Sequence, residues 1–238
     1  WNFFAGSLPD CGAGCPSGGG DPQLDIYLTS LRKNYASVNP PVPGNCEKTA
    51  AFIVIAPGES LGTVAHEFMH AIQYRYDVAG DACGPEYDWF REASATWAED
   101  YVYKDDQSEQ VFAHHFLDEP GLSLDETAGK HEYGAYLFPF FLRYKLGQPE
   151  IVRGIWEIFQ SDASSLQGVD DALQLVGGLE GKWPEFALYN WNRDTVDYYK
   201  DWDSLTTGAK TVDGGAVAVT HGGASSRDFE VSADVSYL

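Results

Sequence analysis

The chain has 238 residues and a formal net charge of −21 at pH 7, with 15 Lys and Arg residues against 36 Asp and Glu residues. This charge excludes nucleic acids and anionic membranes as expected partners, because binding to phosphate groups draws its affinity from Lys and Arg. The apolar fraction of 44% is high enough for one large packed domain, and no apolar run reaches the roughly 18 residues that a membrane-spanning helix needs.

The cysteines indicate the compartment in which the chain works. Their number is even, and the sequence lacks the repeated CxxC pairs that are typical of structural zinc sites. We therefore expect two disulfide bonds, in one of three connectivities, and a secreted protein, because disulfides persist in oxidising compartments. The four residues are Cys11, Cys15, Cys46 and Cys83.

The N-terminal part of the chain predicts two strands. Residues 1–24 are rich in Gly and Pro and indicate an irregular segment. The alternating sequence Leu24–Thr29 (LDIYLT) is typical of a strand, and a helical stretch is expected around residues 29–36. The apolar run Thr49–Ala56 (TAAFIVIA) predicts a second strand, which is either an edge strand that binds peptide by adding it to the sheet or a central strand.

The rest of the chain predicts helices and a β-rich tail. Apolar residues recur at helical spacing in Ser60–Asp77, with Ser60 as the N-cap, and in Asp88–Tyr103. Further helices are expected at 107–117, 133–145, 149–160, 168–176 and 183–192. Residues 208–238 are either a short β-rich tail or the start of a truncated β module. We therefore expect an α+β domain over residues 1–207, with an N-terminal sheet and a mainly helical C-terminal half.

The first predicted helix carries the motif His66-Glu67-Phe68-Met69-His70. Because a helix rises about 1.5 Å per residue, His66 and His70 lie on one face about 6 Å apart, which suits two ligands of one Zn²⁺ ion. Glu67 lies beside this face, where it can act as general base on a zinc-bound water molecule and later pass the proton to the leaving amine. An HExxH motif on a helix therefore predicts the metal site of a zinc peptidase.

A third zinc ligand is expected from the second helix, because the motif lacks the third histidine of the metzincin pattern. Glu92 follows His70 by 22 positions, beside the small residues Ala93–Ala95 (ASA) that let two helices pack closely. In this arrangement the sequence resembles the gluzincins, the thermolysin-like and aminopeptidase-like zinc peptidases, in which a glutamate on the next long helix binds the metal. The resemblance implies Glu92 as the third ligand, with Glu99 on the same face as the alternative.

The resemblance also implies two supporting roles. In thermolysin-like members an acidic residue four positions after the ligand glutamate orients the first histidine; this chain has Thr96 there, which leaves the role to Glu99 or Asp100. Peptide hydrolysis also needs a hydrogen-bond donor for the oxyanion. In the aminopeptidase-like enzymes a tyrosine near a Gly-containing helix start supplies it, and the similar region here offers His131 and Tyr133.

Together, the motif and the resemblance imply a zincin-like metallopeptidase fold and zinc-dependent hydrolysis of peptide bonds in an extracellular setting. The expected partner is a peptide or protein substrate, and the chain is expected to act as a monomer. The alternative is a non-catalytic zincin-like binding or adhesion module, against which Glu67 argues because a purely structural zinc site has no use for it. Calcium is suggested by the pairs Asp105-Asp106 and Asp170-Asp171, without the spacing of an EF-hand.

Overall fold

The structure is a computed structural model of the chain and describes residues 24–30, 36–40, 49–78, 84–161, 164–192 and 198–209. The strands are β1 (Ile26–Leu28), β2 (Ala36–Asn39) and β3 (Phe52–Ile55). The α-helices are α1 (Leu61–Gln73), α2 (Asp88–Tyr103), α3 (Ala113–Leu117), α4 (His131–Gly134), α5 (Leu137–Leu146), α6 (Glu150–Ile158), α7 (Ser165–Leu173), α8 (Gly178–Trp191) and α9 (Tyr198–Asp203). Four 3-10 helices accompany them in the described part: η2 (Pro85–Tyr87), η3 (Glu109–Phe112), η4 (Ala128–Lys130) and η5 (Gln174–Val176).

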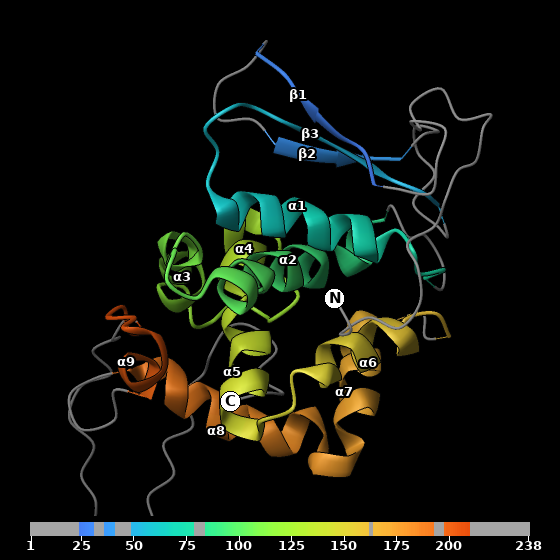
Figure 1. Ribbon diagram of the computed structural model, residues 1–238. Coiled ribbons are helices and arrows are strands. Elements are labelled where there is room, and N and C mark those ends of the chain that lie inside the picture. The colour runs from blue at the N-terminus through green and yellow to red at the C-terminus, as the bar shows by residue number, and fades with distance from the viewer. Residues whose placement is uncertain are drawn as a thin grey trace, which may run out of the picture.

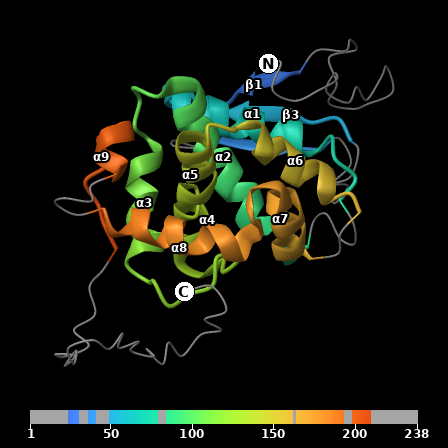
Figure 2. The ribbon, with the colours of Figure 1, turned by 90° about the horizontal axis from the view of Figure 1, so that it is seen from below.

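These elements form an α+β protein that is mostly helical in its described part, with a small three-stranded sheet at one end. The sheet lies on α1, α1 lies on α2, and the later helices lie beyond α2 (Figure 1). From below, α8 runs across the helical side, with α9 toward one end and α7 toward the other (Figure 2). Among the residues that the structure describes, no helix combines the length and the apolar character that crossing a bilayer requires.

The sheet has β3 as its central strand. β3 pairs in parallel with β1, where Ile53 faces Ile26, and antiparallel with β2, where Ile53 faces Val38. Of the two alternatives for the apolar strand, the central one is therefore confirmed and the edge one is wrong. The free edge on the α1 side of the described sheet belongs to β2, which the sequence analysis did not predict because its four residues (ASVN) carry no apolar run.

The helix that carries the HExxH motif begins where it was predicted. The Ser60 side chain caps it, since its Oγ accepts a hydrogen bond from Thr63 N at 2.9 Å. The helix ends at Gln73, before the predicted end at Asp77. The chain turns there because the Tyr74 carbonyl accepts a hydrogen bond from Thr49 N, at 2.9 Å, in the segment that leads into β3.

Helix α2 runs through the middle of the core. Its Trp89, Phe90 and Trp97 side chains have no exposed surface, and aromatic rings of this size each bury on the order of 150–250 Å². Phe90 contacts the rings of both Trp156 on α6 and Phe159, which follows α6. Aromatic packing of this density holds α2 in one position, so a side chain on its α1 side has a fixed place relative to α1.

The other predicted helices are present with shifted ends. The structure divides the predicted helix at 107–117 into η3 and α3, and it adds α9, which the sequence analysis did not predict. Of the expected helical stretch at 29–36, residues 29, 30 and 36 are not helical, and the rest lie outside the described residues. The four cysteines and residues 210–238 also lie outside them, so the disulfide bonds and the β-rich tail stay predictions.

A buried acidic pair fastens α9 to the body of the protein. Glu109 on η3 is buried beside Asp203 on α9, and the side-chain amides of Gln107 and Gln110 donate hydrogen bonds to the Asp203 carboxylate at 2.9 and 3.0 Å. Burial and the neighbouring carboxylates of Asp203 and Asp100 raise the pKa of Glu109 to about 8. This raised pKa favours the neutral form of Glu109 beside Asp203.

We expect Glu109→Gln to stabilise the protein at pH 8 by about 1 kcal/mol or more, which corresponds to a rise in Tm of at least roughly 2–4 °C. The unfolded chain ionises this group near its ordinary pKa of about 4.3, whereas the folded chain keeps the proton up to about pH 8. Stability in the wild type therefore falls as the pH rises through this range, and the glutamine removes that loss because its amide does not ionise.

Thermal unfolding at a series of pH values between about 5 and 8 measures this effect. Glu119→Gln is the matched control, because Glu119 is exposed and makes the same Glu-to-Gln replacement. If Glu109→Gln keeps the pH dependence of the wild type, Glu109 does not hold a proton in the folded state.

Candidate metal centre

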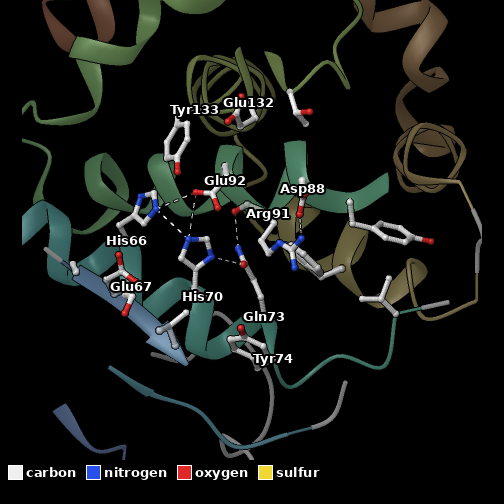
Figure 3. Close-up of a pocket in the computed structure, with 17 residues that line it drawn as sticks. His66, Glu67, His70, Gln73, Tyr74, Asp88, Arg91, Glu92, Glu132 and Tyr133 are labelled. Carbon is white, nitrogen blue, oxygen red and sulfur yellow. Dashed lines mark hydrogen bonds and ion pairs between the residues drawn. The ribbon is translucent and has the colours of Figure 1, made fainter. Parts of the chain in front are cut away.

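Three side chains from two helices meet at one point of the structure. The Nε2 atoms of His66 and His70 are 3.1 Å apart, and Glu92 Oε2 lies 3.3 Å from the first and 3.4 Å from the second. Among the described residues, these three form the one group of metal-binding side chains that could hold an ion. Figure 3 shows the two imidazoles and the carboxylate pointing toward one another across the interface of α1 and α2.

The hydrogen bonds behind the two imidazoles fix where their protons lie. His66 Nδ1 lies 2.9 Å from Glu99 Oε1, and His70 Nδ1 lies 2.8 Å from Gln73 Oε1. Both partner atoms are acceptors, so each Nδ1 carries a proton, and the neutral ring then presents a lone pair on Nε2. Two nitrogen lone pairs and one carboxylate oxygen therefore converge on the same space.

A small divalent cation fits this arrangement. Zinc–ligand distances of about 2.0–2.1 Å in a tetrahedral site place neighbouring ligand atoms roughly 3.3 Å apart, close to the separations of 3.1, 3.3 and 3.4 Å here. Glu92 Oε2 is buried and has no hydrogen-bond partner in the structure, which leaves it available to a cation. Two imidazoles and one carboxylate are also a donor set typical of catalytic zinc.

The close approach of these side chains also shifts the pKa values of His66 and Glu92. Burial lowers the pKa of His66, but its contacts with Glu92 and Glu99 outweigh burial and raise that pKa to about 10. Burial raises the pKa of Glu92, but the two histidines outweigh it and hold the pKa well below its usual range. His66 and Glu92 thus each favour the charged form of the other, and a cation bound between them would compete with the proton on His66.

Glu99, one of the two residues predicted to orient the first histidine, contacts His66, whereas Asp100 forms an ion pair with Arg143. The second oxygen of the Glu99 carboxylate accepts a hydrogen bond from Ser108 Oγ at 2.5 Å. Both Glu99 oxygens are thus engaged, so the carboxylate that orients His66 is itself held in one position.

The start of α1 packs directly against this support. Gly62 N donates to Asp106 Oδ2 at 2.8 Å, and a Cβ atom at Gly62 would collide with Ser108 Oγ. A glycine is therefore needed at this position for the segment after α2 to approach α1 and to carry Ser108 to Glu99. The N-terminal end of the metal-binding helix and the orientation of His66 depend on the same contact.

Gln73 supports the second histidine, a role that was not predicted from the sequence. Its Oε1 accepts from His70, while its Nε2 donates to Arg91 O at 2.9 Å and to Ser94 Oγ at 3.0 Å. The amide thus links the end of α1 to the backbone of α2. Its position three residues after His70 on the same helix was a signal that could have identified it.

The candidate metal site opens into a pocket of about 590 Å³. Its walls come from β2, the metal-binding face of α1, the start of α2, and residues near α4 and α6. Glu67 lines the pocket and accepts a hydrogen bond from Val38 N on the free edge of β2. Burial raises the pKa of Glu67, which moves this carboxylate toward the range of a useful general base.

The structure separates the two predicted oxyanion donors. Tyr133 lines the pocket, its ring stacks with His66 at a centroid distance of 6.0 Å, and its hydroxyl hydrogen-bonds to Glu92. His131 is buried outside the pocket lining, and its Nδ1 lies 3.2 Å from His115 O. Of the two candidates, only Tyr133 lies beside the candidate metal ligands.

The acidic pairs suggested for calcium have protein partners in the structure. Asp106 accepts from Gly62 N, and Asp170 accepts from Leu179 N at 2.7 Å and from Gln174 Nε2 at 2.6 Å. Neither pair belongs to a group of three metal-binding side chains within the described part of the chain. Calcium binding stays a prediction.

We expect Gln73→Leu to weaken zinc binding by about 10- to 100-fold, because His70 loses the acceptor that fixes its ring. Competition with a coloured chelator measures the affinity, and circular dichroism shows whether the variant folds. Gln167→Leu, at an exposed glutamine on α7, is the control for the same change of side chain. An unchanged affinity in Gln73→Leu would mean that the amide does not hold His70.

Comparison with known proteins identifies no relative of this chain. No protein-family model matches the chain, and no curated protein or solved structure matches it either. The function is therefore inferred from the positions and the chemistry of the side chains in the pocket.

Proposed function

We propose that the chain is a zinc-dependent peptidase of the gluzincin kind, with a zincin-like fold, that hydrolyses peptide bonds. The observation that carries the proposal is the convergence of His66, His70 and Glu92 within 3.4 Å of one another, with Glu67 on the pocket side of the same helix. A buried structural metal would need neither a neighbouring pocket nor a free carboxylate. Three protein ligands beside a pocket of about 590 Å³ leave room for a fourth ligand and for substrate.

The metal and Glu67 divide the chemistry between them. When bound, zinc would lower the pKa of water at the site and would polarise the carbonyl of the scissile bond. Glu67 would accept a proton from the attacking water and deliver it to the nitrogen of the leaving amine. Its hydrogen bond from Val38 N holds the carboxylate in place, and its burial suits it to both proton transfers.

Tyr133 is the residue that we assign to the oxyanion. Its hydroxyl is next to Glu92, so it lies within reach of a carbonyl oxygen that approaches the metal. Burial and nearby carboxylates raise the pKa of Tyr133, so the hydroxyl keeps its proton at neutral pH. A protonated phenol can donate a hydrogen bond to the negative oxygen that forms when water attacks.

The edge of β2 with which no described strand pairs provides a place for the substrate backbone. Ala36, Ser37 and Val38 line the pocket, and their other side pairs with β3. A peptide in extended conformation could add to this edge as a further strand, with backbone hydrogen bonds that do not depend on its side chains. In this position its carbonyl groups would pass along the face of α1 that carries Glu67.

We expect Glu67→Gln to keep zinc and to lose peptide cleavage, with kcat lower by at least about 10²- to 10⁴-fold, because the amide cannot accept the proton. We expect Glu92→Gln to lose both zinc and cleavage, because the neutral amide is a far weaker metal ligand. Elemental analysis of the purified proteins and hydrolysis of casein or gelatin measure the two properties separately.

Two other outcomes would contradict the proposal. If the wild type binds zinc but cleaves no peptide, and Glu67→Gln behaves in the same way, the chain is a zincin-like binding or adhesion module. If the wild type holds no zinc after purification and after reconstitution with zinc, the convergence of the three ligands does not create a zinc site.

We expect Tyr133→Phe to lower kcat by roughly 10²-fold with little change in KM and in zinc content, because the hydroxyl donates to the substrate oxygen only when the oxyanion forms. Steady-state kinetics with a single peptide substrate provide the measurement. Tyr103→Phe is the control, since Tyr103 lies at the end of α2 and does not line the pocket. A fall in zinc content instead of kcat would assign Tyr133 to metal binding.

A further inference from the structure

Acidic groups outnumber basic groups among the charged side chains that line the pocket. Apart from the candidate metal ligands His66 and His70, they are Glu67, Asp88, Glu92 and Glu132 on the acidic side and Arg91 on the basic side. Arg91 forms an ion pair with Asp88, three positions earlier on α2. Glu92 would serve the metal and Glu67 the proton transfers, so both acidic groups have a role in the proposed reaction. Glu132 is the remaining carboxylate, and the proposed reaction gives it no role.

The position of Glu132 makes a purely structural role a poor explanation. Its Oε2 atom has almost no contact with solvent and no hydrogen-bond partner among the described residues. Burial raises the pKa of Glu132 and the charge of Lys130 lowers it through space, but no ion pair joins the two side chains, and Lys130 Nζ lies 5.8 Å from the centre of the Phe112 ring. The neighbouring acid, Glu126, accepts hydrogen bonds from the backbone of Thr127 and Ala128. A buried carboxylate oxygen without a partner costs free energy unless a ligand supplies a donor.

Glu132 also lies where a substrate side chain or terminus would pass. It is adjacent to Tyr133 in the sequence, and the two residues lie on the side of the pocket opposite to Glu67 and Tyr74 (Figure 3). A peptide that places its carbonyl between Glu67 and Tyr133 would therefore have a neighbouring group within reach of Glu132.

We propose that Glu132 binds a positively charged nitrogen of the substrate next to the scissile bond, so that the enzyme prefers cationic peptides. This inference rests on the proposed peptidase function and names its substrate class. The nitrogen can come from a Lys or Arg side chain or from a free α-amino group. The net charge of −21 supports the same preference, because a strongly acidic protein attracts cationic ligands over distance.

The test uses peptides that differ only in charge. Fluorescence-quenched peptides carry Lys or norleucine at a single position and have a free or an acetylated amino terminus, and mass spectrometry identifies the bond that is cleaved. We expect kcat/KM for the cationic peptide to exceed that for its norleucine or acetylated partner by roughly 30-fold or more. Loss of the preference on acetylation identifies the α-amino group as the ligand, and loss with norleucine identifies the side chain.

Two variants connect the preference to Glu132. We expect Glu132→Gln to remove it through slower cleavage of the cationic peptide, while zinc content and cleavage of the neutral peptide stay near wild type. We expect Glu132→Lys to reverse it in favour of peptides with Asp or Glu at the same position. Glu119→Gln, at an exposed site, is the control for the same loss of charge.

The outcomes separate this inference from the peptidase function. If the wild type cleaves cationic and neutral peptides equally, or if neither variant changes the ratio, the inference is wrong and the peptidase function stands. If the wild type cleaves no peptide, the proposed function fails, and anisotropy of the same peptides decides the inference. Tighter binding of the cationic peptide that Glu132→Gln removes would support the role of Glu132; equal binding would overturn it.

Discussion

The close packing of α1 against α2 determines where every ligand atom of the candidate metal site lies. His66 and His70 are one turn apart on α1, and Glu92 must reach the space between them from the facing helix. Helices approach this closely only where side chains at the contact are small, and Gly62 and Ser94 meet that requirement from the two sides. Larger residues at these positions would push apart the segments that hold the carboxylate and the imidazoles.

The same interface also determines which ring nitrogen of His66 and of His70 carries the proton. Glu99 on α2 accepts from His66, and Gln73 at the end of α1 accepts from His70 while its amide donates to α2. A displacement of either helix would therefore change both the separation of the ligands and the tautomers of the imidazoles. The aromatic core around α2 opposes such a displacement, because dense packing makes an interior stiff. Most of the described chain thus acts as a rigid support for the ligand atoms of the candidate metal site.

The sequence predicted the parts of this site that depend on periodicity. The spacing of His66 and His70 and the Ser60 cap follow from the geometry of one helix, and Glu92 followed from the resemblance to a family. The short strand β2 and helix α9 escaped prediction because tertiary contacts stabilise them, and their own sequences carry weak patterns. The packing of two helices likewise decides that Glu99 rather than Asp100 contacts His66, and one sequence does not contain that information.

Helix α4 shows why the choice between His131 and Tyr133 required a structure. Residues three apart on a helix share a face, whereas residues two apart point about 200° away from each other. Gly134 packs so tightly on the backbone near α3 that an added Cβ would lie 2.7 Å from Phe112 O. This contact turns the face of His131 and Gly134 toward α3, where His131 is buried. Glu132 and Tyr133 are left to line the pocket, so one close contact at a glycine brings both the candidate oxyanion donor and the unpaired carboxylate to the same wall.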